Sequence, residues 1–425
     1  MIERIDHARR GALKGLLLAG IALSLPLGAS LPAAADDLKG TLSFMAAEYS
    51  PKTAPFWQDQ VKQFEAAHPG VTVNLEVVGW QQMHDTTAQR IAAGNLPDLV
   101  NTATIWLPEW VEADALQEVT PDYVSDAVRN DIVPALLEKG AAYKGKTYGL
   151  PIAAGGRGMF VNNKLLTDAG LDPTKPPKTF DELKADALQI KAKTGQFGFA
   201  YDAKGVQAFR YFGFFLWNAG GDFFDADGKA AFNSDAGVKA LSFLVDLAKS
   251  GATPDPTGSA IEDLEPIFLA GRLAMLIDGN YFATNVQTNA KDVAFSVAAT
   301  PTIDANTPSI LWGVTDTLVI SKKANPALVK AFIDQIYSTK ARTTLDVNEG
   351  LIPLLKSQAS VSEFANDKVQ TAFISMMPTA RFDPLNPHYS QMQELVKTAM
   401  QQALTGTDPK KALDDAASAF NALAQ

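Results

Sequence analysis

The sequence of 425 residues contains no cysteine and only four histidines: His7, His68, His84 and His388. The absence of cysteine excludes disulfide bonds, zinc–thiolate centres and cysteine nucleophiles. No two histidines have the HxxxH or HExxH spacing that is typical of zinc enzymes. We therefore expect a protein with no metal centre and no cofactor.

Runs of basic residues are also missing, and acidic side chains outnumber basic ones by 47 to 37, which gives a formal net charge of −10. This charge balance disfavours nucleic acid as a partner. The GxSxG nucleophile motif is absent, and no arrangement of histidines indicates a catalytic triad. Composition and motifs therefore give no indication of an enzyme.

The N-terminus has the order of a secretory signal peptide. Residues 3–15 are rich in basic side chains, residues 16–31 are apolar but interrupted by Pro26, and residues 32–37 supply small side chains. The apolar run is shorter than the ~20 residues that span a bilayer. We expect cleavage after Ala35 and a soluble periplasmic protein, with either general or twin-arginine export, because residues 9–14 (RRGALK) resemble a twin-arginine signal.

The mature chain begins with alternating strand and helix patterns. Residues 40–47, 71–80 and 97–104 are predicted as strands, and residues 53–69 and 81–94 have helical periodicity. This order is typical of βαβ units with a parallel sheet, and hence of an α/β fold. Further along, Thr179 and Glu182 have the spacing of a helix capping box. No low-complexity linker is present, so two domains would have to be interwoven.

Polar and aromatic side chains follow these strands. Open parallel sheets bind their ligands in a crevice at the carboxyl ends of the strands. A core would favour Val or Ile at these positions, and a plain surface would not favour Trp. The residues that we predict to line this part of a site are Glu48, Tyr49, Gln81, Thr102, Thr104 and Trp106.

Several stretches, in family order, resemble the substrate-binding proteins of bacterial ABC sugar importers, the maltose-binding-protein-like family. They are FEAAHPGVTVNLE, RIAAGNLPDLV, YGLPIAAGGRGMFVNNKLLTDAGLDP with KTFDELKADALQIK, FLWNAGGDFFDADGKAAFNS, AGRLAMLIDGNY and AMQQALTGTDPKKALDDAA. Together they extend over nearly all of residues 40–425. The resemblance implies a type II-like periplasmic-binding-protein fold, in which two α/β lobes are joined by three chain crossings and hold the ligand in the cleft between them.

The resemblance also divides the chain between the lobes. It implies an N-terminal lobe of residues 36–153 and 316–347 and a C-terminal lobe of residues 154–315 and 348–425, after a signal peptide at residues 1–35. The crossings fall near Ala154, between Trp312 and Asp316, and between Asn348 and Gly350. At the first crossing, Gly155 and Gly156 interrupt the predicted strand, which suggests a chain crossing or a bend.

The second lobe is expected to add its own ligand contacts. In the family, hydrogen-bonding side chains follow the first crossing, and Gly156 departs from the acidic residue that maltose binders carry there. A stacking aromatic residue commonly occupies the turn that contains Tyr281. The residues that we predict for the second lobe and the crossings are Gly156, Arg157, Asn280, Tyr281, Trp312, Gly313 and Arg381.

The resemblance implies a monomeric, non-enzymatic component of an ABC importer that closes around a sugar or sugar derivative and delivers it to a membrane permease. Planar rings suit the C–H faces of a sugar, and polar side chains suit its hydroxyl groups. Two alternatives remain open. Arg157 and Arg381 together would suit an anionic ligand such as a uronate, a sulfonated sugar or a glycerophosphodiester. An exported carbohydrate-active enzyme would need two opposed carboxylates, for which Glu48 and Asp278 are candidates.

Overall fold

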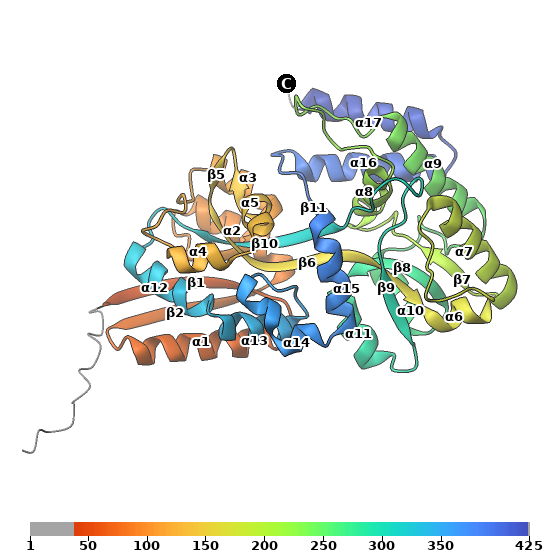
Figure 1. Cartoon of the computed structure of the whole chain (residues 1–425). Coiled ribbons are helices and arrows are strands. Elements are labelled where there is room, and N and C mark those ends of the chain that lie inside the picture. The colour runs from red at the N-terminus through yellow and green to blue at the C-terminus, as the bar shows by residue number, and fades with distance from the viewer. Residues whose placement is uncertain (1–37, 424–425) are drawn as a thin grey trace, which may run out of the picture. The chain divides into compact units, whose positions relative to one another are not determined.

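The computed structural model describes residues 38–423, and the predicted signal peptide at residues 1–35 lies outside the described residues. Within the described chain, nine strands form one sheet in the order β2-β1-β3-β10-β6-β8-β7, with β9 also paired to β6 and β11 to β10 (Figure 1). None of the described helices combines the length and the apolar character needed to cross a bilayer. The strands are β1 (Gly40–Glu48), β2 (Val71–Gly79), β3 (Leu99–Ala103), β6 (Gly149–Asn162), β7 (Phe197–Ala200), β8 (Leu273–Gly279), β9 (Phe295–Ala298), β10 (Trp312–Ile320) and β11 (Arg381–Phe382), and the pair β4 (Ala142–Tyr143) and β5 (Lys146–Thr147) is separate.

The first half of the sheet has the predicted βαβ arrangement. Strand β1 pairs in parallel with both β2 and β3. The predicted elements are confirmed, since helix α1 (Thr53–Ala67) follows β1 and helix α2 (Met83–Ala92) follows β2. All five residues of β3 are buried, as expected for an inner strand of an α/β sheet. The carboxyl ends of these strands meet at one edge of the sheet. The remaining helices of this half are α3 (Leu107–Glu112), α4 (Asp126–Asp131), α5 (Pro134–Gly140), α12 (Pro326–Ile336) and α13 (Thr339–Glu349).

Strands β10 and β6 connect this half of the sheet to the other one (Figure 1). Strand β10 is antiparallel to β3 on one side and to β6 on the other. Strand β6 begins beside β10 and ends beside β8 and β9. It runs without a break through Gly155 and Gly156, so the predicted interruption there is wrong. A Cβ atom at position 155 would lie 2.6 Å from Asn280 Oδ1. Glycine at this position therefore allows the Asn280 side chain to approach the backbone of β6 closely.

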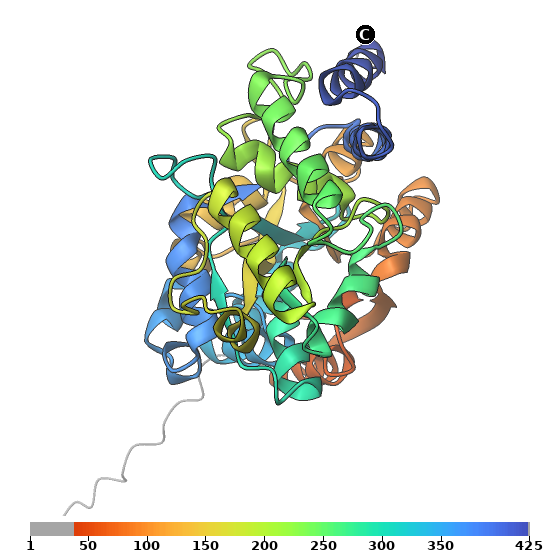
Figure 2. The ribbon, with the colours of Figure 1, turned by 90° about the vertical axis from the view of Figure 1, so that its right-hand side faces the viewer.

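Helices cover the second half of the sheet, where β8 pairs with β6 and β7. Figure 2, seen from the side of β7, shows helices α7 and α9 in front of the sheet. The predicted capping box of α7 is confirmed: Thr179 Oγ1 accepts from the Glu182 amide at 3.2 Å, and Glu182 Oε2 accepts from the Thr179 amide at 3.2 Å. The helices of this half are α6 (Asn163–Asp168), α7 (Phe180–Thr194), α8 (Ala208–Asn218), α9 (Asp235–Lys249), α10 (Ile261–Leu269), α11 (Tyr281–Asn289), α14 (Ser362–Ala365), α15 (Lys368–Met376), α16 (Tyr389–Leu404) and α17 (Pro409–Leu423).

Candidate ligand-binding site

A cavity of about 760 Å³ lies where the ends of β1 and β8 approach the middle of β6 and β10. This volume falls within the range of roughly 300–1,000 Å³ that small-molecule sites occupy. Both halves of the sheet contribute to its walls, as does the end of helix α13. The lining residues are Glu48, Tyr49, Ser50, Pro51, Trp80, Ala153, Ala154, Gly155, Gly156, Arg157, Gly279, Asn280, Tyr281, Thr284, Asn285, Thr288, Asn289, Val314, Asp316, Asn348, Glu349 and Leu351.

Stacked aromatic rings form one wall of the cavity. Tyr49 follows β1 and Trp80 follows β2, and their ring centroids lie 5.7 Å apart at an interplanar angle of 32°. Trp106 stacks behind Trp80 at 5.7 Å and 25°, and the His84 ring meets Trp106 edge-on at 5.0 Å. Trp80 lines the cavity, whereas Trp106 does not and instead supports Trp80 from behind. The sequence prediction omitted Trp80, although it occupies a strand end of the kind that guided the prediction.

A buried carboxyl group lies on the cavity wall in the centre of the sheet. Asp316 on β10 is 7% exposed, and its Oδ2 accepts a hydrogen bond from the Tyr49 hydroxyl at 2.7 Å. Burial raises the pKa of Asp316 to about 7, while the hydrogen bond from Tyr49 opposes this shift. Burial and the nearby Asp316 carboxylate also raise the pKa of Tyr49 well above its usual value. Tyr49 was among the predicted site residues, whereas Asp316 was not.

On the opposite side, Arg157, Asp278 and Tyr281 form a hydrogen-bonded cluster. Arg157 Nη1 donates to Asp278 Oδ1 and to the Tyr281 hydroxyl, both at 3.3 Å, and the Tyr281 hydroxyl lies 2.8 Å from Asp278 Oδ1. The Arg157 guanidinium also lies 5.4 Å from the centre of the Tyr281 ring. Burial raises the pKa of Asp278, and Arg157 opposes that shift. Arg157 therefore lines the cavity as a cation that is already paired with Asp278.

Glu265 lies behind this cluster on helix α10. Burial, followed by the charge of Asp278, raises the pKa of Glu265 to about 8. Asp278 Oδ2 is buried and accepts no hydrogen bond from a donor in residues 38–423, and a protonated Glu265 carboxyl can donate to Asp278. Asn285, which lines the cavity, donates to Glu265 Oε2 at 3.4 Å.

Asn280 connects β6 to the segment that follows helix α13. Its Oδ1 accepts from the Gly156 amide at 3.1 Å, and its Nδ2 donates to the Gly350 carbonyl. The Asn280 amide donates in turn to the Gly156 carbonyl at 3.1 Å. Nearby, the Ile352 amide donates to the Ala154 carbonyl at 2.9 Å. These bonds connect the predicted crossing near Ala154 with the one near Gly350, and residues of both segments line the cavity.

The structure brings some of the predicted residues together and places others elsewhere. Glu48, Tyr49, Gly156, Arg157, Asn280 and Tyr281 line the cavity.

Gln81 is exposed and does not line the cavity, so its place in the site stays a prediction. Thr102 and Thr104 are buried and do not line it either, so their placement in the site is corrected. Thr102 accepts from Trp110 Nε1 at 3.2 Å. The Thr104 hydroxyl lies 2.7 Å from the Thr315 carbonyl oxygen and 3.0 Å from that of Gly140, within the core beside β10.

The predictions for Trp312, Gly313 and Arg381 are corrected in the same way. Trp312 is fully buried, with its ring stacked on Trp217 at 4.1 Å, and Gly313 lies under the Phe382 ring. Arg381 pairs with Asp222 and lies 4.7 Å above the centre of the Trp217 ring. Arg381 lines a different cavity, so it does not join Arg157 at the candidate site.

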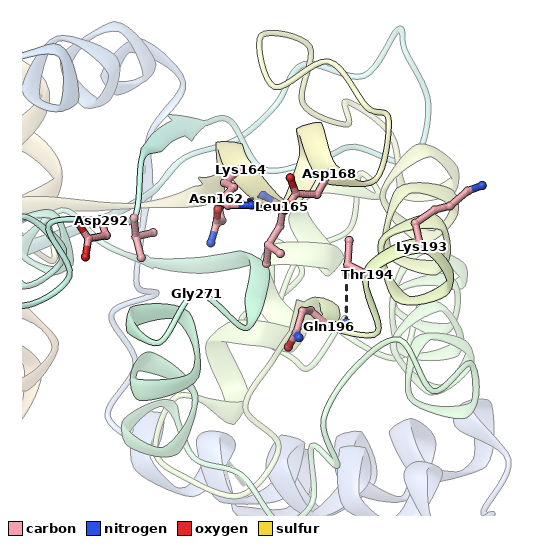
Figure 3. A pocket seen from close by; sticks show the side chains of 10 residues that line it. Asn162, Lys164, Leu165, Asp168, Lys193, Thr194, Gln196, Gly271 and Asp292 are labelled. Atoms are coloured by element: carbon pink, nitrogen blue, oxygen red, sulfur yellow. Dashed lines mark hydrogen bonds and ion pairs between the residues drawn. The ribbon is translucent and has the colours of Figure 1, made fainter.

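A smaller cavity of about 430 Å³, close to helices α6 and α7, has a different character (Figure 3). Its lining includes Lys164, Asp168, Lys193 and Asp292, and it contains no aromatic residue. It shares no residue with the larger cavity. In residues 38–423 no group of histidine, aspartate and glutamate side chains is arranged to hold a metal ion.

The α/β halves and the cavity between β1, β6, β8 and β10 define an extracellular solute-binding protein, and the comparisons agree. The chain belongs to the bacterial extracellular solute-binding protein family, whose model matches residues 48–343. A putative binding protein of Brucella abortus is 31% identical over 414 residues, which cover 96% of this chain and 98% of that protein.

Solved structures confirm the two-lobed fold. An ABC transporter solute-binding protein from Thermotoga lettingae, bound with alpha-D-tagatose, is 27% identical with a TM-score of 0.76 and covers 90% of this chain and 99% of that chain. The cyclic alpha-maltosyl-1,6-maltose binding protein of Arthrobacter globiformis is 23% identical with a TM-score of 0.78 over 90% of this chain and 98% of that chain. The resemblance noted in the sequence, and the fold that it implied, are therefore confirmed.

Proposed function

We propose that this protein is the sugar-binding component of an ABC importer, and that the 760 Å³ cavity is its ligand site. One observation carries the proposal: aromatic rings and hydrogen-bonding side chains from both halves of the sheet face the same cavity. Tyr49 and Trp80 come from one half and Tyr281 from the other, and amide side chains such as Asn285 lie between them. Rings of this kind stack on the C–H faces of a sugar, while amides and carboxylates bind its hydroxyl groups.

The relatives support a sugar as the ligand class. The Thermotoga lettingae structure contains alpha-D-tagatose, and the Arthrobacter globiformis protein binds cyclic alpha-maltosyl-1,6-maltose. A thermal-shift screen of mono- and disaccharides, followed by calorimetry on the sugars that stabilise the protein, tests the proposal. Saturable binding that is lost in Tyr281→Ala supports it, with the fold checked by circular dichroism. Binding that is unaffected by Tyr281→Ala and Trp80→Ala contradicts this choice of site.

The proposed mechanism is closure of two lobes around the sugar. The lobes consist of residues 36–153 with 316–347 and of residues 154–315 with 348–425, and the crossings near Ala154, Trp312–Asp316 and Asn348–Gly350 serve as the hinge. A ligand that contacts both lobes favours the closed state, because its affinity for that state is higher. Small-angle scattering should show a smaller radius of gyration with the sugar bound. Tight binding with unchanged scattering contradicts closure.

We further propose that the protein acts as a periplasmic monomer that delivers its ligand to a membrane permease. The N-terminal sequence supports export, and mass spectrometry of the periplasmic protein should show a chain that starts at Asp36. An intact chain in the cytoplasm contradicts export. Size-exclusion chromatography with light scattering tests the monomeric state.

Neither alternative class receives support from the site. An enzyme would need Glu48 and Asp278 as opposed carboxylates, but Asp278 is held by Arg157 and Tyr281 and does not line the cavity. A reducing-end assay on purified protein should therefore detect no hydrolysis of the bound sugar. An anionic ligand would need two free arginines, and Arg381 lies at another cavity.

A further inference from the structure

The charges that line the candidate site are unbalanced. Glu48, Asp316 and Glu349 contribute carboxyl groups to the cavity wall. Among the lining residues, all of which lie in the described chain, the one cationic side chain is Arg157, and it is paired with Asp278. The cavity therefore presents a negative potential to a ligand, which repels anions and attracts cations.

Asp316 differs from the other two lining carboxyl groups in its surroundings. Glu48 is exposed to water, and Glu349 Oε1 accepts a hydrogen bond from Thr53 Oγ1 at 2.8 Å. Asp316 is 7% exposed, and only its Oδ2 accepts a hydrogen bond, from Tyr49, within residues 38–423. Its Oδ1 has no donor in that part of the chain, although Asp316 belongs to the cavity wall.

Within residues 38–423, no cationic side chain forms an ion pair with Asp316. The Arg210 guanidinium acts on Asp316 through its charge, but Arg210 forms its own ion pair with Asp383 at 3.2 Å. A buried carboxylate without a counter-charge is unstable relative to its protonated form, and its pKa of about 7 reflects this. A cation bound in the cavity beside Asp316 would neutralise the charge of the Asp316 carboxylate.

We propose that Asp316 forms an ion pair with a protonated amino group of the ligand, so that the substrate is an amino sugar or a similar polyhydroxylated amine. This inference rests on the proposed function and narrows its ligand class. A hydroxyl group could also donate to Asp316, but it would leave the cavity's negative charge uncompensated. The rings of Tyr49 and Trp80 remain available for the C–H faces of such a ligand.

Calorimetry on the full mature protein with charge-matched sugars tests the proposal. The probes are glucose, galactose, mannose and cellobiose, each compared with its 2-amino counterpart, together with glucuronate and galacturonate. A charged hydrogen bond stabilises a complex by about 1.4 kcal/mol more than a neutral one, which corresponds to roughly ten-fold in affinity. We therefore expect at least one amino sugar to bind about ten-fold more tightly than its neutral parent, and both uronates to bind more weakly.

The results of this comparison distinguish a failure of the amine proposal from a failure of the proposed function. Neutral sugars that bind as tightly as their amines, or uronates that bind most tightly, overturn the amine proposal and leave the sugar-binding function intact. Absence of binding by every probe overturns this inference, and the proposed function falls as well if the thermal-shift screen of mono- and disaccharides also finds no sugar that binds. The comparison uses wild-type protein, so it does not depend on whether a variant folds.

The variant Asp316→Asn identifies the residue responsible. Asparagine retains an acceptor for the Tyr49 hydroxyl, so binding of the neutral parent should change by less than about three-fold. Binding of the amine should fall about ten-fold to the level of the parent. Arg381→Met is the control because Arg381 lines another cavity, and it should change neither affinity. An amine preference that survives in Asp316→Asn overturns the role of Asp316.

Proton release provides an independent readout. The ionisable groups around Asp316 are Glu48 at the end of β1, Tyr49 just after it, Arg157 on β6, Glu349 on α13 and Arg210 on α8. Burial raises the pKa of Asp316 to about 7, so Asp316 is partly protonated near neutral pH, and a bound cation displaces that proton. Calorimetry in two buffers of different ionisation enthalpy should therefore show that wild-type protein releases more protons than Asp316→Asn on binding the amine. Equal proton release in the two proteins contradicts the ion pair.

Discussion

Replacing Glu265 by glutamine is expected to stabilise the protein at neutral and alkaline pH. Glu265 lies behind the cavity beside Asp278, and burial together with the charge of Asp278 raises its pKa to about 8. The native protein therefore holds Glu265 protonated at pH 7, while the unfolded chain releases that proton. Glutamine keeps an acceptor for Asn285 and supplies an N–H donor for Asp278, with no proton to lose.

The pH dependence has a definite sign. The folded pKa lies above the ordinary value of 4.5, so the contribution of Glu265 to stability is complete below pH 4.5 and is lost as the pH rises towards 8. Each pH unit in this window corresponds to about 1.4 kcal/mol, or roughly 3 kcal/mol between pH 4.5 and pH 7. Because the side chain is only half-buried, solvent screening reduces this to on the order of 1–2 kcal/mol.

Urea unfolding followed by circular dichroism at pH 5, 7 and 8.5 measures this effect. The advantage of Glu265→Gln over wild type should be small at pH 5 and grow with pH. The groups that act on Glu265 are Asp278 on β8, Glu262 on α10 and Asn285 on α11. Glu138→Gln, at an exposed position on α5, is the control and should show no such trend. A difference between Glu265→Gln and wild type that stays constant across the three pH values would refute the reasoning.

Four further substitutions separate the site from the core. Trp80→Ala removes a ring from the cavity wall and should weaken sugar binding by about 1–3 kcal/mol, as measured by calorimetry. Trp312→Ala should instead lower the free energy of unfolding by about 3–5 kcal/mol, as seen in urea titrations, because Trp312 is fully buried against Trp217. Arg381→Met should leave the calorimetric affinity for a neutral sugar unchanged. Asn280→Ala removes hydrogen bonds to Gly156 and Gly350, so amide hydrogen exchange at Gly156 should become faster.

Local patterns in the sequence predicted the first half of the sheet because its neighbours in space are also neighbours in the chain. Strands β1, β2 and β3 and helices α1 and α2 follow directly from alternating and helical periodicities. The capping box at Thr179 is local as well, since its two partners lie three residues apart. The predicted boundaries differ from the observed ones by a few residues at most, as frayed helix ends and strand ends allow.

Pairing across long sequence separations could not be predicted in this way. Strand β10 inserts between β3 and β6, and nothing in its own sequence specifies these neighbours. Because β10 packs beside β3, the end of β3 is buried, and the Thr104 hydroxyl lies near the carbonyl oxygen of Thr315. The same insertion places Asp316 beside Tyr49, 267 residues away in the chain. The sequence does not reveal the insertion of β10 between β3 and β6. For this reason the prediction includes Thr102 and Thr104 in the site and omits Asp316.

The charge of the site depends most strongly on such distant pairings. Arg157 is an obvious ligand-binding candidate in the sequence, yet the register of β6 against β8 pairs it with Gly279 and so brings it to Asp278. A guanidinium that is neutralised inside the protein no longer favours an anionic ligand. Asp316, in contrast, accepts a hydrogen bond from a hydroxyl group and forms no ion pair with a cationic side chain of residues 38–423. The residue types alone indicate aromatic rings and hydrogen bonds, whereas the sign of the charge that a ligand meets follows only from which side chains the sheet brings together.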